Sequence, residues 1–206
     1  LSGIGDILEK TIRAGHKIVG FKGTGRKCGS STLLLGAVAE LARRGWNILV
    51  VDGSFDHPSL ASSLELKTET GWDDAVFRKA PLESAMVRIA VTTENQSENT
   101  TDRKPSFCFL PLVPQTVSRA IVASCKKDWL NKILDLSDRF DLVLVDTGSY
   151  GLDSLEEKVQ EMLRFGVDGF FLVKDTRNRV NAFIPELVDQ IRKVDLACLG
   201  IIENFI

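Results

Sequence analysis

The sequence predicts an α/β fold with a doubly wound, mostly parallel sheet and helices on both faces. Strand-like apolar runs alternate with helical patterns along the chain, and most of these runs are continuously apolar rather than alternating. Continuous apolar runs are typical of strands that are buried on both faces of a parallel sheet. The regular alternation of strands and helices implies right-handed crossovers around such a sheet.

The expected elements follow from these runs in order. We expect strands at 17–22, 47–52, 106–113, 141–147, 168–174 and 197–202. We expect helices near 31–45, 57–64, 71–79, 117–138, 153–165 and 180–193, and a helical lead-in at 1–15.

Length, charge and cysteine usage limit the class of protein further. The chain has 206 residues, so we expect a single domain that spans 1–206. Its net charge is −2 and its pI is about 5.8, which argues against a nucleic-acid surface. No apolar run approaches the ~20 residues of a membrane-spanning helix. The cysteines lack the spacing of a zinc site and fit a reducing cytosol.

One polar segment interrupts the alternation of strands and helices. Residues 92–105, TTENQSENTTDRKP, contain no aliphatic side chain and end in proline. Such a segment has no apolar anchor, so we expect a mobile loop within the domain. A tolerated surface insertion and a partner-binding loop are both open for it.

The stretch GTGRKCGSST, residues 23–32, occupies the place of a phosphate-binding loop between a strand and a helix. Such a loop surrounds an anion with backbone N–H groups and a helix N-terminus. A lysine then neutralises the phosphates, and the next Ser or Thr hydroxyl binds Mg²⁺. If Gly29 is the last glycine of the motif, the lysine position is Ser30 and the metal hydroxyl is Ser31. The alternative is a glycine-containing turn that ends in a serine cap.

Two later strands each end in an aspartate. Asp52 follows the run NILVV, and Asp146 follows DLVLV. In phosphate-binding ATPases, an aspartate at a strand end holds Mg²⁺ or its water beside the phosphates. The alternative for each aspartate is a cap on the helix that follows.

With these motifs the chain resembles the MinD/ParA group of P-loop ATPases. Within this group it is most similar to the cytoplasmic domains of bacterial tyrosine kinases and related polysaccharide chain-length regulators. The matching stretches are KCGSSTLLLGAVAELARRGWNILVVDGSFDHPSL, TGWDDAVF, RFDLVLVDTGS, GFFLVKDTRNR and LGIIENF. The resemblance covers about residues 15–206 and implies a P-loop NTPase-type fold.

The sequence departs from the family pattern where the chemistry takes place. By position, the phosphate-binding lysine is Ser30 and the second acid of the first strand end is Ser54, so the Walker A motif is degenerate. The resemblance places Asn204 at the strand-end asparagine beside the adenine base. The candidate nucleotide-binding residues are Gly25, Arg26, Lys27, Cys28, Gly29, Ser30, Ser31, Thr32 and Asn204. The candidate Mg²⁺ residues are Ser31, Asp52 and Asp146, and no catalytic residue is assigned.

The resemblance implies a pseudokinase-like regulatory or assembly component of cell-surface polysaccharide biosynthesis or export. ATP or ADP with Mg²⁺ is expected to bind weakly or not at all. One alternative is an active ATPase or tyrosine kinase that uses Lys27 or Arg26 as a substitute cation. Another is an interaction module that binds no nucleotide.

The expected partners also follow from the resemblance. They are a membrane adaptor or polysaccharide-export protein and further copies of the chain in a homo-oligomer; nucleic acid is not expected. The chain begins at Leu1 without a signal-peptide pattern, so we interpret it as a fragment. We expect a cytoplasmic protein that reaches the inner face of the membrane through a partner or an upstream segment.

Overall fold

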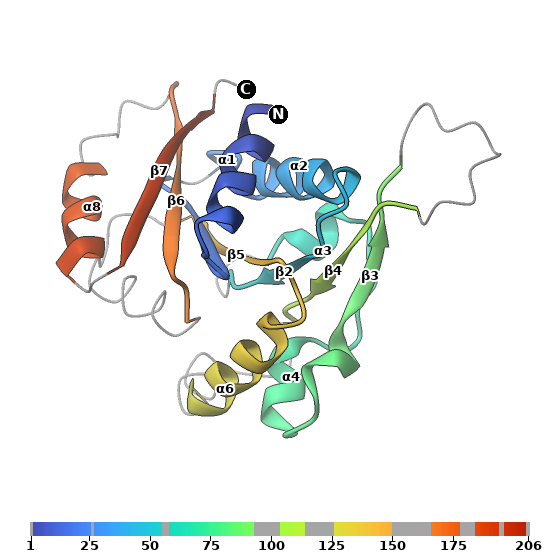
Figure 1. Cartoon of the computed structure of the whole chain (residues 1–206). Coiled ribbons are helices and arrows are strands. Elements are labelled where there is room, and N and C mark those ends of the chain that lie inside the picture. The colour runs from blue at the N-terminus through green and yellow to red at the C-terminus, as the bar shows by residue number, and fades with distance from the viewer. Residues whose placement is uncertain are drawn as a thin grey trace.

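The protein forms a mostly parallel sheet with helices packed on both faces (Figure 1). The computed structural model describes residues 2–25, 27–54, 58–92, 104–113, 126–149, 166–177, 184–193 and 196–204. The strands are β1 (Ile18–Gly23), β2 (Ile48–Asp52), β3 (Val87–Ala90), β4 (Ser106–Leu110), β5 (Leu142–Ser149), β6 (Gly169–Asp175) and β7 (Ala197–Asn204). Their order in the sheet is β3-β4-β2-β5-β1-β6-β7, and β3 alone runs antiparallel to its neighbour among these strands.

The helices form two layers. They are α1 (Ser2–Arg13), α2 (Ser30–Arg43), α3 (Leu60–Ser63), α4 (Trp72–Phe77), the 3₁₀ helix η1 (Leu82–Ala85), α6 (Lys126–Ser137) and α8 (Ile184–Lys193). Helices α1, α2 and α3 pack on one face through the core that contains Leu8, Leu34 and Leu60. Helices α4, α6 and α8 pack on the other face through the core that contains Trp72 and Trp129. Figure 1 shows α1 and α2 on the opposite side of the sheet from α4 and α6.

The central strands are buried on both faces, as their apolar runs predict. Every residue of β1 and β2 is buried, and the side chains of each strand alternate between the two cores. Gly20 in β1 leaves room for the ring of Phe170 in β6, because a Cβ there would lie 2.1 Å from Phe170 Cε1. The four strands expected at the centre of the sheet, β1, β2, β5 and β6, begin and end within one or two residues of their predicted bounds.

The edge of the sheet differs from the prediction. β3 was not expected, and it pairs with β4 in antiparallel register from Val87 opposite Phe109 to Ala90 opposite Ser106. Its exposure alternates along only four residues, which is too short a pattern to identify from the sequence. The strand expected at 106–113 ends at Leu110, directly before Pro111, whose ring removes a backbone donor.

The expected helices are shorter than predicted where they can be compared. Helix α3 covers only 60–63 of the expected 57–64, and α4 covers 72–77 of 71–79. Helices α6 and α8 begin at the edges of the described ranges, and the helix expected at 153–165 lies outside them. Most of the segment expected to be a mobile loop, 93–103, also lies outside the described residues. None of the helices in the described ranges is long and apolar enough to span a bilayer.

The parallel arrangement brings the ends of β1, β2 and β5 to one edge of the sheet. Because β5 lies between β1 and β2, the segments that follow these three strands meet there. In open α/β sheets, ligands bind outside the carboxyl ends of the strands at such an edge. The predicted phosphate loop follows β1, Asp52 is the last residue of β2, and its register partner Asp146 lies in β5 near this edge.

Candidate functional site

The loop after β1 folds tightly onto the start of α2. Gly29 has a φ of 81° and Lys27 a φ of 56°, so both lie in the left-handed region. Helix α2 begins at Ser30, and its N-cap residue, Gly29, has no side chain that could cap the first turn. The first N–H groups of a helix have no acceptor within the helix, so they are available to an anion at this end.

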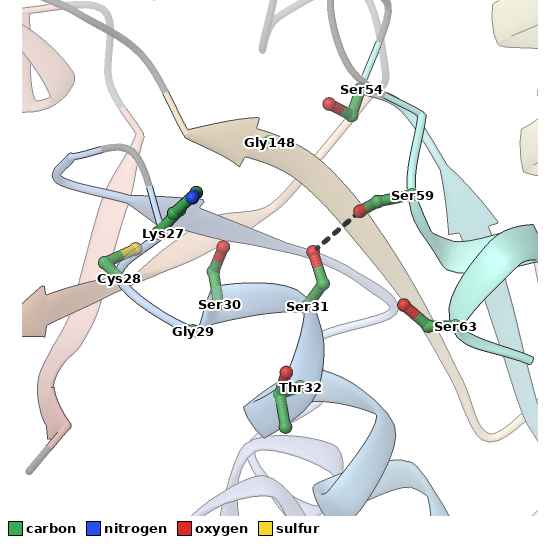
Figure 2. Close-up of a pocket in the computed structure, with 10 residues that line it drawn as sticks. All are labelled: Lys27, Cys28, Gly29, Ser30, Ser31, Thr32, Ser54, Ser59, Ser63 and Gly148. Carbon is green, nitrogen blue, oxygen red and sulfur yellow. Dashed lines mark hydrogen bonds between the residues drawn. The ribbon is translucent and has the colours of Figure 1, made fainter. Parts of the chain in front are cut away.

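A pocket of about 350 Å³ opens at the N-terminus of α2. Figure 2 shows the ten residues that line it, which come from the phosphate loop and the first turn of α2, the segment between β2 and α3, α3 itself and the end of β5. They are Lys27, Cys28, Gly29, Ser30, Ser31, Thr32, Ser54, Ser59, Ser63 and Gly148. Six of them carry a hydroxyl and one, Lys27, carries a positive charge. The pocket therefore offers many hydrogen-bonding groups and little fixed charge.

Asp52 and Asp146 lie side by side next to this pocket. They are register partners in the parallel strands β2, which ends at Asp52, and β5, which continues past Asp146 to Ser149, and both are fully buried. Ser31 Oγ donates to Asp146 Oδ2 at 2.5 Å, and the Gly148 N–H donates to Asp146 Oδ1 at 2.9 Å. Asp52 Oδ1 accepts from the Ser54 N–H at 3.1 Å. Asp52 Oδ2 is buried and has no hydrogen-bond partner in the described part of the chain.

Burial makes it costly for both carboxyl groups to be charged. Burial and the neighbouring Asp146 raise the pKa of Asp52 to about 8, although the Ser54 and Leu60 N–H groups oppose this shift. Burial also raises the pKa of Asp146, while the Ser31 hydroxyl, the Gly148 N–H and the Lys22 charge oppose it. A bound cation would reverse this balance, because it stabilises both carboxylates in their charged form.

The residues present fit a magnesium ion. Mg²⁺ prefers oxygen ligands and keeps several waters, with one or two carboxylates and phosphates completing the shell. Ser31, Asp146 and the unpartnered oxygen of Asp52 supply such ligands, directly or through water. The described residues contain no cluster of three or more His, Cys, Asp or Glu side chains that could hold a metal ion. An ion here would therefore depend on hydroxyl, water or phosphate oxygens as well.

The positions where the family pattern has charged groups hold small hydroxyl side chains. Ser30 is 5% exposed and Ser54 is 7% exposed, and both line the pocket. Lys27 is exposed and lies on the pocket wall, whereas Arg26 lies outside the described residues. Gly25 lies in the loop but does not line the pocket. Neither Ser30 nor Ser54 can supply the charge of a lysine or an acid.

Three further residues at this edge were not identified from the sequence. Lys22 is only 2% exposed, its Nζ donates to the Thr147 carbonyl at 3.4 Å, and its charge lowers the pKa of Asp146. A lysine inside an apolar strand run was a signal that could have found it. Ser59 lies 3.5 Å from Ser31 between hydroxyl oxygens, and Ser63 lines the same pocket. Ser59 belongs to the stretch HPSL that carries the resemblance, which was a signal that could have found it, whereas nothing in the sequence distinguishes Ser63 from a surface residue.

Asn204 lies against the phosphate loop, although it is distant in sequence. It is the last residue of β7 and is 7% exposed. Its Nδ2 donates to the Cys28 carbonyl at 2.8 Å. The structure therefore brings Asn204 to the loop, where its amide nitrogen contacts the backbone; its expected place beside an adenine base stays a prediction.

Solved structures of similar shape identify the fold. The BceF tyrosine kinase domain superposes with a TM-score of 0.72 at 16% identity, over 98% of this chain and 73% of that chain. The kinase domain of the Escherichia coli tyrosine kinase ETK gives 0.73 at 14% identity, over 98% and 75%. The septum site-determining protein MinD from Pyrococcus horikoshii, complexed with Mg-ADP, gives 0.64 at 20% identity, over 90% and 68%.

The comparison defines the class of fold to which the chain belongs. It has the P-loop NTPase-type fold of the MinD/ParA ATPases, close to that of bacterial tyrosine kinase domains, which confirms the fold expected from the sequence. No protein-family model matches the sequence, and no curated protein matches it significantly.

Proposed function

We propose that this protein is a nucleotide-binding regulatory domain that holds ATP or ADP together with Mg²⁺ and does not hydrolyse ATP. One observation carries the proposal. Ser31 and the buried pair of Asp52 and Asp146 keep the arrangement of a metal site, while the adjacent lysine position is a buried serine. The unpartnered oxygen of Asp52 supports the metal, because a buried polar atom without a partner is costly to retain otherwise.

The missing charges support binding without turnover. Transfer of a γ-phosphoryl group spreads negative charge over oxygens that a lysine and a metal ion stabilise. One charge-assisted contact contributes about 1.5–3 kcal/mol to binding, and its loss at Ser30 weakens the site without removing the metal ligands. Ser54 stands where the family that this chain resembles has an acid, which assists the metal and the nucleophile. Binding therefore tolerates these replacements better than catalysis does.

The biological role that we propose follows the resemblance and the neighbours of known structure. Several of these neighbours are described as tyrosine kinase or kinase domains. We propose that the chain acts in the cytoplasm as a non-catalytic component of cell-surface polysaccharide synthesis or export. A membrane adaptor and further copies of the chain are the proposed partners.

An active enzyme that uses Lys27 is the second candidate function. Lys27 lines the pocket beside Ser30, so its ammonium group could approach a bound phosphate (Figure 2). Its left-handed backbone, with φ of 56°, is uncommon for a residue other than glycine, and such outliers cluster at functional sites. Arg26 stays a further candidate for this role.

The rate of ATP hydrolysis separates the two candidates. We expect the wild-type protein with Mg-ATP to release phosphate no faster than a buffer control, and Lys27→Ala to leave that rate unchanged. Lys79→Ala is a matched control, because Lys79 is also an exposed lysine with a φ of 56° but lies at the end of α4, away from the pocket. Turnover that is lost in Lys27→Ala and kept in Lys79→Ala would overturn the proposal in favour of an enzyme.

A further inference from the structure

The side chain of Asn204, at the end of β7, forms a hydrogen bond with the backbone of the phosphate loop. We propose that Asn204 is a positioning residue that clamps the loop in its phosphate-binding shape, rather than a residue that selects the base. Its predicted effect on ligands rests on the proposed function, whereas its effect on the loop does not.

The hydrogen bond defines the orientation of the Asn204 amide. The Cys28 carbonyl oxygen is an acceptor only, so the amide nitrogen must be the atom that faces it. The carbonyl of Cys28 and the N–H of Gly29 belong to one planar trans peptide and point in opposite directions. A bond that holds the Cys28 carbonyl toward Asn204 therefore aims the Gly29 N–H away from Asn204. Gly29 lines the pocket and Asn204 does not, so this N–H is directed to serve a phosphate.

The close approach of Asn204 leaves no room for a side chain at position 29. A Cβ at Gly29 would lie 2.3 Å from Asn204 Nδ2, a separation that no packed side chain adopts. The φ of 81° at Gly29 is a second reason for glycine, since other residues are strained in that region. The glycine of the loop therefore allows both the turn and the approach of the asparagine amide.

The backbone of Asn204 is held in place by Thr176, the residue directly after β6. Thr176 donates from both its N–H and its Oγ1 to the Asn204 carbonyl, each at 3.1 Å. Asp175 is the register partner of Asn204 in the pairing of β6 with β7. The amide that contacts the loop thus projects from a fixed strand end, which is what a positioning residue requires.

The two roles considered for Asn204, positioning the loop and selecting the base, predict different effects of Asn204→Ala on ligand affinity. A clamp shapes the loop that binds phosphates, so Asn204→Ala should weaken Mg-ATP, Mg-GTP and inorganic Mg-tripolyphosphate by the same factor, about five- to tenfold. A residue that contacts adenine should weaken Mg-ATP alone. Calorimetric titration of the three ligands into the wild type and the variant measures the difference. A loss confined to Mg-ATP would overturn the clamp.

The loop can also be tested without a ligand. The Leu33 N–H donates to the Gly29 carbonyl at 2.9 Å, so its hydrogen exchange reports on opening of the loop. Asn204→Asp keeps the size of the side chain but cannot donate to Cys28, and it should speed Leu33 exchange about five- to tenfold. The Gly53 N–H, which donates to the Asp146 carbonyl at 2.8 Å, should be unaffected. Thr176→Val removes one of the two bonds to the Asn204 carbonyl but keeps the amide that donates to Cys28, so it should speed Leu33 exchange less than Asn204→Asp does.

A double-mutant cycle provides the second readout. Gly29→Ala should be less destabilising in an Asn204→Ala background than in the wild type, because the amide that opposes the new methyl group is gone. We expect the coupling between the two substitutions to change the unfolding constant by roughly fivefold or more. Additive effects together with unchanged Leu33 exchange in Asn204→Asp would overturn the clamp. If no ligand binds the wild type, the proposed function is wrong. Leu33 hydrogen exchange and the double-mutant cycle still test the role of Asn204, because neither needs a ligand.

Discussion

At the scale of single residues, the two buried aspartates are the costly feature of the site. A packed interior seldom retains a carboxylate oxygen without a partner, and Asp52 Oδ2 is such an atom within the described residues. Asp146 beside it increases the cost, because like charges disfavour ionisation of each other. Stability is commonly sacrificed in this way where a site must bind a cation. The apo-protein should therefore gain stability when one charge is removed.

Asp52→Asn tests this cost through its dependence on pH. The pKa of Asp52 rises from its ordinary value of 3.8 to about 8 on folding, so the folded state holds the proton more tightly. This contribution to stability is complete below about pH 4 and is lost as pH rises through 8. Asparagine does not titrate, so the free energy of unfolding of the variant should not fall in this way as pH rises. At pH 9 we expect it to exceed that of the wild type by about 1–3 kcal/mol. Urea unfolding from pH 5 to 9 measures it, and parallel curves for the two proteins would contradict it.

Ser30→Lys tests whether the loop keeps its phosphate-binding register. Ser30 is the first residue of α2 and lines the pocket, so a lysine there can extend toward a bound phosphate. We expect Mg-ATP to bind roughly ten- to a hundredfold more tightly, a gain of about 1.4–2.8 kcal/mol from the added charge. Calorimetric titration measures this gain. An unchanged affinity in a folded variant would show that Ser30 does not occupy the lysine position.

At the scale of elements, the sequence predicts what local pattern determines. The continuous apolar runs identified β1, β2, β5 and β6, because strands buried on both faces need apolar side chains on both. The strand-end aspartates and Ser31 followed from their places after these runs. β3 was missed because its pairing with β4 is antiparallel and its pattern is four residues long.

The contacts that complete the site depend on residues far apart in the chain. Asn204 meets Cys28 across 176 positions, and Lys22 meets Thr147 across 125. Neither contact leaves a periodic pattern in the sequence, because the sheet order brings these segments together. Ser59 approaches Ser31 for the same reason. Pattern reasoning therefore located the loop and the candidate metal ligands, and the resemblance named Asn204, but neither predicted which groups these residues contact.

Gly20→Ala tests the packing of β1 against β6, which places the phosphate loop. The new methyl group would lie 2.1 Å from Phe170 Cε1, and the ring is fully buried in the core. We expect a loss of about 1–3 kcal/mol in the free energy of unfolding, as for other overpacked cores. Gly3→Ala in α1 is the control, because its Cβ meets nothing within 4 Å and alanine favours the helix. Equal unfolding midpoints in urea for Gly20→Ala and the wild type would contradict the packing described.

At the scale of the whole molecule, one edge of the sheet gathers everything that the proposed function needs. The loop after β1, the paired aspartates of β2 and β5, and the last residue of β7 converge around the N-terminus of α2. The rest of the fold supports this edge with two separate apolar cores, one on each face. The site keeps the candidate metal ligands and has a serine at the position that the resemblance assigns to the lysine. This combination is the basis of the proposed metal-dependent binding without turnover.

Calorimetric titration of the wild-type protein with ATP, in Mg²⁺ and then in EDTA, tests this claim most directly. Because the fixed charge at the pocket wall is small, the ion must supply most of the attraction for the phosphates. We predict binding in Mg²⁺ that is at least about tenfold weaker in EDTA. Equal affinity in both buffers would show that the aspartates and Ser31 hold no metal beside the nucleotide. No binding in either buffer would show that the fold acts without a nucleotide.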